Sequence, residues 1–124
     1  MNDVEQFDTP TMARIERGIR VIADGTRLAL HGDLDLDTAP VLLDVLFERL
    51  ADCGRHGMAQ LEIDCARLGF CDSSGLAALL LARQRAEEAG VRLSLRRQPE
   101  HLRHLLELTG ICALFPPEHP PPLP

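Results

Sequence analysis

The apolar and polar positions of the chain change their spacing several times between a strand-like and a helix-like repeat. Two short extended runs, residues 20–23 and 27–31, stand on either side of Asp24-Gly25, a dipeptide that favours a tight hairpin turn. Apolar residues then recur at helical spacing across residues 39–50, as they do along one side of a helix. This part of the chain therefore predicts a hairpin followed by an amphipathic helix.

In the rest of the chain, stretches in which apolar and polar residues alternate are followed by stretches in which apolar residues recur at helical spacing. The alternation is typical of strands with one buried face. The first predicted element is a strand over residues 60–65, which a short connection separates from an apolar stretch over 68–71. The chain then predicts a helix over 72–89, a strand over 91–95, a helix over 99–110 and a short strand or helix over 111–115.

Strand–helix alternation from residue 60 onward requires right-handed parallel crossovers, whereas the first two strands form an antiparallel hairpin. The predicted fold class is therefore α/β, with a mixed four- to five-stranded sheet and helices packed mainly on one face. Residues 13–115 are expected to form this single domain, after a flexible N-terminal lead-in over residues 1–12. Residues 116–124 hold six of the nine prolines of the chain and predict a Pro-rich, extended tail.

Composition narrows the possible functions of this 124-residue chain. Its formal net charge is −6, all 13 basic residues are Arg, and Trp and Tyr are absent. Without Lys there is no Schiff-base or P-loop chemistry, and without a basic surplus or an aromatic platform the chain is not expected to bind nucleic acid. The N-terminus lacks a secretory signal and no apolar run approaches the ~18 residues of a membrane span, so we expect a cytoplasmic protein that does not enter a membrane.

Two groups of potential metal ligands do not match a metal motif. The cysteines at positions 53, 65, 71 and 112 contain no C-x-x-C pair and are mostly flanked by apolar residues, so they predict inert core thiols. The run Asp33-Leu34-Asp35-Leu36-Asp37 lacks the remaining residues of an aspartyl-phosphate phosphatase motif. We therefore expect neither a metal ion nor a cofactor.

The segment Asp72-Ser73-Ser74-Gly75 stands at the start of the second predicted helix and is the most informative chemical feature. A helix N-terminus presents unpaired N–H groups and the positive end of the helix dipole. One interpretation is that Asp72 or one of the serines only caps the helix. The other is that one hydroxyl remains exposed and can be phosphorylated: if Ser73 caps the helix, the Ser74 hydroxyl lies unused in the first turn.

These residues carry a family resemblance. Residues 63–90, IDCARLGFCDSSGLAALLLARQRAEEAG, resemble the core of a STAS domain, the fold of bacterial anti-sigma factor antagonists. The upstream segment LHGDLDLDTAP, residues 30–40, resembles the G-(E/D)-L-D segment of that family. The segment LRHLLELTGI, residues 102–111, resembles the last helix of the family and the L-x-x-(S/T)-G motif at its end. The resemblance covers residues 18–115 and implies a STAS-like fold.

The resemblance also implies a function, carried over position by position. Ser74 corresponds to the regulatory phosphoacceptor, Asp72 to the acid of the motif, and Asp35 to an acid that lies near the acceptor and supports its phosphorylation; Ser73 and Gly75 complete the motif. The implied protein is not an enzyme. Its unphosphorylated form binds an anti-sigma factor with serine kinase activity and releases a sigma factor, and phosphorylation of Ser74 ends the binding until a serine phosphatase resets the switch.

The family also leaves an alternative open, since related domains act as subunits of lipid-transport or stress-signalling complexes that do not control a sigma factor. The resemblance is compatible with a monomer or a weak dimer.

Overall fold

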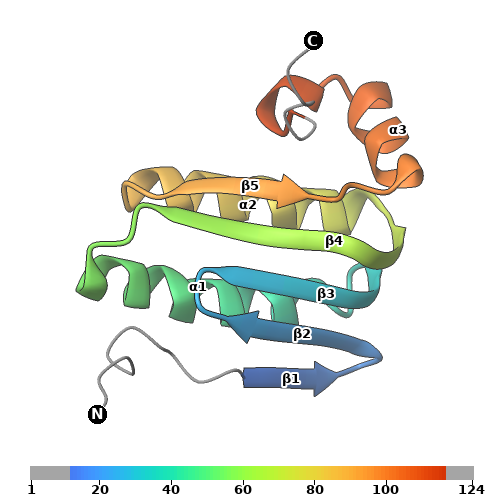
Figure 1. Cartoon of the computed structure of the whole chain (residues 1–124). Helices are drawn as coiled ribbons and strands as arrows, with labels where there is room; N and C mark the ends of the chain where they lie inside the picture. The colour runs from blue at the N-terminus through green and yellow to red at the C-terminus, as the bar shows by residue number, and fades with distance from the viewer. Residues whose placement is uncertain (1–11, 117–124) are drawn as a thin grey trace, which may run out of the picture.

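The computed structural model describes residues 12–116, so most of the predicted lead-in and of the predicted Pro-rich tail lies outside the described residues. The described part comprises strands, three α-helices and one short 3-10 helix (Figure 1). The elements are β1 (Met12–Glu16), β2 (Ile19–Asp24), β3 (Arg27–Leu34), α1 (Ala39–His56), β4 (Gln60–Cys71), α2 (Ser73–Glu88), β5 (Arg92–Arg96), α3 (Glu100–Leu108) and the 3-10 helix η2 (Cys112–Leu114).

The five strands form one sheet in the order β1-β2-β3-β4-β5. The pairs β1–β2 and β2–β3 are antiparallel, and β3–β4 and β4–β5 are parallel. Helices α1 and α2 make the two parallel crossovers and lie side by side behind the sheet in Figure 1, whereas α3 lies beyond the end of β5. The mixed sheet and the placement of α1 and α2 on one face confirm the predicted fold class.

The predicted hairpin is confirmed as the turn between β2 and β3. Asp24 pairs with Arg27, which leaves Gly25 and Thr26 as the turn residues. Gly25 has a φ of 63°, a left-handed conformation that glycine adopts without the strain of a side chain.

The sequence pattern did not predict β1. Its five residues form the outer edge of the sheet, and none of their side chains is fully buried. Arg14 points toward α1, where its Nη2 lies 3.2 Å from Glu48 Oε2. Without a buried face, β1 has no apolar alternation by which it could be recognised.

The predicted break between residues 65 and 68 is wrong, because β4 runs without interruption through both stretches. Its parallel register with β3 shifts twice, within Ala29–His31 and within Gly32–Leu34, and at each shift β4 contributes one extra residue. The buried residues Cys65, Leu68 and Cys71 are therefore spaced by three positions and not by two. Two β-bulges explain why the alternation looked broken.

The core lies between the sheet and the pair α1 and α2. It contains Cys53, Cys65 and Cys71, as predicted, and burial raises the pKa of the Cys65 thiol to about 12 and that of Cys71 to about 11. The fourth cysteine does not follow the prediction: Cys112 lies in η2 and is exposed, whereas Phe115 of the same apolar segment is buried in the core and Ile111 packs against it.

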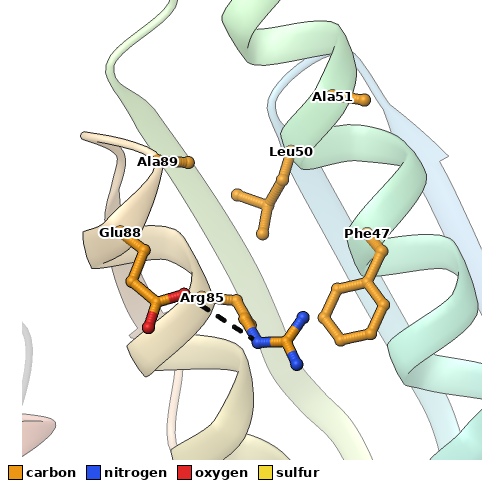
Figure 2. Close-up of a pocket in the computed structure, with 6 residues that line it drawn as sticks. All are labelled: Phe47, Leu50, Ala51, Arg85, Glu88 and Ala89. Carbon is orange, nitrogen blue, oxygen red and sulfur yellow. Dashed lines mark ion pairs between the residues drawn. The ribbon is translucent and has the colours of Figure 1, made fainter.

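Near their C-terminal ends, α1 and α2 leave a groove of about 350 Å³ between them (Figure 2). Across this groove the Arg85 guanidinium lies 5.2 Å from the centre of the Phe47 ring, and Arg85 also pairs with Glu88. The groove is at the end of α2 opposite to the Asp-Ser-Ser-Gly segment, so it belongs to the packing of the helices and not to that segment. It is lined by Phe47, Leu50, Ala51, Arg85, Glu88 and Ala89.

Candidate functional site

The N-terminus of α2 is capped by Asp72. This residue is extended (φ −107°, ψ −170°), and its Oδ1 accepts a hydrogen bond of 3.0 Å from the Gly75 N–H. Of the capping residues that the sequence left open, Asp72 is therefore the one that caps the helix, and Ser73 and Ser74 occupy its first two helical positions.

Gly75 brings the first turn of α2 directly onto the end of β3. A Cβ atom at this position would lie 2.9 Å from the Leu34 carbonyl carbon and closer still to its oxygen. The same carbonyl oxygen accepts a hydrogen bond of 3.3 Å from the Asp72 N–H. The glycine of the motif is thus required by packing, since any side chain would push α2 away from β3.

The two serines differ in exposure but share one property. Ser73 is exposed and Ser74 is half-buried, and within residues 12–116 neither hydroxyl takes part in a hydrogen bond. Both lie where the backbone N–H groups of the first helical turn and the helix dipole favour a negative charge. The cap leaves both hydroxyls available for chemistry.

Asp35 lies in the loop between β3 and α1 and organises that loop through the backbone. Its Oδ1 accepts hydrogen bonds from the N–H groups of Asp37 (3.0 Å) and Thr38 (3.1 Å). Thr38 is the residue at the N-cap position of α1, but its hydroxyl donates back to the Asp33 carbonyl oxygen at 2.8 Å and does not cap the helix. The loop is therefore held in one shape next to Leu34, on which α2 begins.

The structure brings the loop of Asp35 and the start of α2 to the same corner of the molecule, through their shared contact with the end of β3. It does not join the side chains: among the described residues, Asp35 makes no hydrogen bond or ion pair with Asp72, Ser73 or Ser74. The carboxylate of Asp35 is instead directed to its own loop.

Asp33 has a structural role that the sequence did not indicate. Its Oδ1 accepts a hydrogen bond of 2.8 Å from the Phe70 N–H, at the second bulge of β4. A Cβ atom on Gly69 would collide with the same oxygen, so the glycine makes room for this bond. On the other side, the Gly69 carbonyl oxygen contacts the Nε2 of His101 on α3. The end of β4 is thus tied to both β3 and α3.

Two exposed apolar side chains flank this corner, and sequence analysis did not single them out. Leu36, in the loop after β3, is 74% exposed, and Phe70, at the end of β4, is 60% exposed. Exposed large apolar residues next to a polar site are typical of protein-binding surfaces. The available signal was the position of Phe70 next to Gly69, in a chain with only four aromatic residues.

The corner formed by Leu36, Phe70 and the α2 N-terminus is called the Ser74 corner below. Across residues 12–116 no group of three or more His, Cys, Asp or Glu side chains is arranged to hold a metal ion. In the same range no helix is long and apolar enough to cross a membrane.

Several solved structures share this fold. The chain superposes on an anti-sigma factor antagonist from Mycobacterium paratuberculosis with 24% identity over 87% of this chain and 83% of that one, at a TM-score of 0.58. The anti-sigma factor antagonist SpoIIAA in its unphosphorylated form has 16% identity over 89% of each chain and a TM-score of 0.61. A putative anti-sigma factor antagonist from Thermotoga maritima has 14% identity over 86% of this chain and 84% of that one, at a TM-score of 0.62.

At these identities the structural likeness concerns the fold alone, and no curated protein sequence matches the chain. The family is given by sequence: residues 20–116 match the family model described as "Mlab, STAS domain". This match runs from the second residue of β2 to the end of the described part, and it includes every residue of the Ser74 corner. The chain therefore belongs to the STAS-domain family.

Proposed function

We propose that this protein is an anti-sigma factor antagonist, a binding protein without a reaction of its own. Its unphosphorylated form binds an anti-sigma factor with serine kinase activity and so releases a sigma factor. The observation that carries the proposal is Ser74, a half-buried serine in the first turn of α2 whose hydroxyl makes no hydrogen bond within residues 12–116. The fold shared with proteins described as anti-sigma factor antagonists supports the same role.

Phosphorylation of Ser74 is the proposed off-switch, and the fold can accept it. A phosphate there lies at the N-terminal end of α2, where the helix dipole and the first-turn N–H groups favour negative charge. The Asp72 carboxylate takes up the N–H of Gly75, and phosphate oxygens can use the remaining donors. The phosphorylated protein therefore stays folded.

The phosphate has the opposite effect on a partner protein that covers the Ser74 corner, because it opposes binding. Phosphorylation adds about −1.5 to −2 charges, beside the carboxylate of Asp72 and close to the acidic loop of Asp35. Burying such a charge without a partner of opposite sign is strongly unfavourable. The modification therefore acts on binding and leaves the fold unchanged.

The exposed side chains of Leu36 and Phe70 are the proposed anchors of the interface. Buried apolar anchors supply most of the binding free energy of protein interfaces, and polar groups around them fix the orientation. The matching surface of the anti-sigma factor is accordingly an apolar pocket with hydrogen-bond acceptors for the serine hydroxyls.

The other motif residues are assigned positioning roles. Asp35 holds the loop that carries Leu36, and Asp72 and Gly75 fix the start of α2. Ser73, which is exposed, contacts the partner without being phosphorylated. A serine phosphatase resets the switch. Since the kinase needs ATP as its phosphate donor, we place the protein in the cytoplasm, as a monomer or weak dimer.

The direct test is phosphorylation by the anti-sigma kinase encoded in the same genome. The wild-type protein and the Ser73→Ala variant should each gain one phosphate with ATP, and the Ser74→Ala variant should gain none, as measured by intact-mass spectrometry and peptide mapping. Phosphate on Ser73, or on the Ser74→Ala variant, would sink the assignment.

Binding is measured on the same set of variants. Ser74→Ala should bind the kinase as tightly as the wild type, whereas Ser74→Glu should bind about tenfold more weakly or worse, because it places a permanent charge in the interface. Ser73→Glu is the matched control and should lose less affinity, since its side chain already lies in solvent.

The alternative function, a subunit of a lipid-transport or stress-signalling complex, requires the same fold and is separated by its partner. A pull-down from native lysate with the Ser74→Ala variant should recover an ATP-binding anti-sigma factor. Recovery of a transport ATPase without a sigma regulator would establish the alternative.

A further inference from the structure

The face of the sheet opposite to α1 and α2 carries a line of basic side chains. The register places Arg20 of β2 opposite His31 of β3, and His31 opposite Arg67 of β4. At the β1 end of this line, Ile15 lies opposite Arg20. Residues that pair across strands point to the same face of a sheet, so these four side chains cross β1, β2, β3 and β4 side by side. They are called the cross-strand row below.

The cross-strand row lies on the face that the described helices leave uncovered. In β2 the residues on either side of Arg20 are buried in the core, so Arg20 itself points away from the core. Helices α1 and α2 lie behind the sheet in Figure 1. Arg20 and Arg67 are exposed, His31 is half-buried and Ile15 is 64% exposed. The four side chains are therefore accessible from the same side.

No carboxylate of the described residues neutralises the cross-strand row. Across residues 12–116, Arg20 and Arg67 make no ion pair or hydrogen bond, and the His31 ring has no hydrogen-bond partner. The carboxylate of Asp33, two residues beyond His31 in β3, accepts the Phe70 N–H. The basic side chains of the row thus keep their hydrogen-bond donors for another molecule.

The stability of the sheet does not account for this arrangement. Side chains that face each other across two strands stabilise a sheet when they are apolar or of opposite charge, and like charges directly opposite are destabilising. The chain contains 19 acidic residues, yet none of those described pairs with the row. The row is better explained by acidic groups that come from another molecule.

Apolar side chains stand beside the row on the same face of the sheet. Ala13 lies opposite Ile22, and Ile22 lies opposite Ala29, each two residues along its strand from a member of the row. Ala13 is exposed, and Ile22 and Ala29 are half-buried. Exposed apolar residues next to arginine are typical of protein interfaces, in which arginine is enriched. The composition of this surface therefore fits a protein better than a free ion.

We propose that the cross-strand row docks an extended acidic segment of a partner protein. Neighbouring strands lie about 4.8 Å apart, so the row spans about 14 Å from Ile15 to Arg67. Positions i, i+2 and i+4 of an extended peptide point to one side and also span about 14 Å. A segment with one large apolar residue and two carboxylates at these positions places the apolar residue on Ile15 and the carboxylates near Arg20 and Arg67.

The chemistry of the row agrees with this occupant. A guanidinium group donates two parallel, charge-assisted hydrogen bonds to a carboxylate. Complementary charges fix the register of the docked segment and speed its association, whereas the apolar contact adds affinity.

The charge of the whole molecule favours a short protein segment over a larger polyanion. The chain has a net charge of −6, which opposes the approach of a nucleic acid or an anionic membrane that extends beyond the row. A segment of about five residues covers the row alone and stays away from the acidic remainder of the surface.

This proposal does not rest on the proposed sigma-factor function, because the cross-strand row contains none of the residues of the Ser74 corner. The Ser74→Glu variant should bind an acidic segment at the row as the wild type does. Failure of one proposal therefore leaves the other unaffected.

The test is a titration of the full chain with the peptide acetyl-Leu-Ser-Glu-Ser-Glu-amide, followed by amide NMR. This peptide should cause saturable shifts at the residues of the cross-strand row, with a dissociation constant on the order of 1 mM. The uncharged peptide acetyl-Leu-Ser-Gln-Ser-Gln-amide should cause none. The peptide acetyl-Ser-Ser-Glu-Ser-Glu-amide, which lacks the apolar residue, should bind about fivefold more weakly.

Three variants locate the binding. Arg67→Gln should weaken the binding of the first peptide by about fivefold, through loss of one charge-assisted contact. Ile15→Ser should weaken the binding of the peptide with leucine and leave that of acetyl-Ser-Ser-Glu-Ser-Glu-amide unchanged. Arg103→Gln is the matched control, since it removes an equal charge from an exposed position on α3, outside the row, and should leave the affinity unchanged. Circular dichroism checks that all three variants fold.

Four outcomes would overturn the proposal. The first is the absence of saturable shifts at the row, and the second is equal binding of the charged and uncharged peptides. The third is an equal loss of affinity in Arg103→Gln and Arg67→Gln, which would indicate diffuse charge attraction. The fourth is sedimentation of the protein with vesicles of phosphatidylglycerol and phosphatidylcholine, lost in Arg67→Gln, which would assign the row to a membrane surface.

Discussion

Gly75 is the residue at which helix α2 and strand β3 come closest together. A Cβ atom there would overlap the Leu34 carbonyl group, so the variant Gly75→Ala must shift the helix. We expect a loss of about 1–3 kcal/mol in the free energy of unfolding, as for other overpacked sites. Urea denaturation measures it.

Gly54→Ala is the control for this prediction. Gly54 lies within α1, where a Cβ atom would meet no atom within 4 Å. Alanine is favoured over glycine inside a helix by about 1 kcal/mol or less, so this variant should be neutral or slightly more stable. Equal destabilisation by both substitutions would contradict the packing argument.

Asp64 makes the stability of the protein depend on pH. The hydrogen bonds from Arg97 hold the pKa of the Asp64 carboxyl below its ordinary value of 3.8. The unfolded chain therefore takes up a proton before the folded one does. The stabilisation from this carboxylate is complete above the ordinary pKa and is lost as the pH falls through the lower, folded-state pKa.

The variant Asp64→Asn should accordingly be less stable than the wild type at pH 7, and the difference should shrink below about pH 4. Urea denaturation at pH 7 and in acid gives both values. In Asp37→Asn, whose exposed side chain bonds to no other described residue, the difference should not change with pH in this way. A constant difference for Asp64→Asn would refute the pairing as its cause.

At the residue scale, the sequence reveals the Asp-Ser-Ser-Gly motif but does not reveal which of its residues caps the helix. Asp72, Ser73 and Ser74 are all residue types that cap helices. Which of them does so depends on the extended backbone of Asp72 and on its distance to the Gly75 N–H. The close packing of Gly75 on Leu34 is a tertiary contact, and the sequence alone does not contain it.

At the scale of the elements, β4 depends on a hydrogen bond from outside its own strand. The Asp33 carboxylate accepts the Phe70 N–H at the second bulge. In Asp33→Ala this N–H loses its acceptor, so we expect faster amide hydrogen exchange at Phe70 and a loss of about 1 kcal/mol in stability. Asp37→Ala, in the same loop, should leave the exchange at Phe70 unchanged; if it does not, the effect belongs to the loop's charge and not to this bond.

The elements that were predicted correctly are those with one buried face. The hairpin, α1, α2, α3 and β5 show the apolar spacing of their type, and the structure has them within a few residues of the prediction. The two failures have physical causes. Strand β1 buries no side chain completely, and β4 changes its inward positions at each bulge. A search for apolar residues at every second position detects neither an edge strand without buried side chains nor a strand with bulges.

At the scale of the whole molecule, the four thiols report on global unfolding. Cys53, Cys65 and Cys71 are buried, with raised pKa values that keep them protonated, whereas Cys112 is exposed. With a thiol reagent at pH 8, one thiol per chain should react at once and three should react only as the protein unfolds. In the Cys112→Ala variant the fast phase should vanish; a second fast thiol would show that the core opens locally.

The strands follow one another across the sheet in the order in which they occur in the chain. During translation, each new strand can therefore pair with a strand that has already left the ribosome. No strand has to insert between two strands that are already paired. Since domains begin to fold from the N-terminus while they are synthesised, the Ser74 corner can assemble once α2 has emerged, before β5 and α3 are complete. Ser74 is then in place before β5 and α3 have been added to the domain.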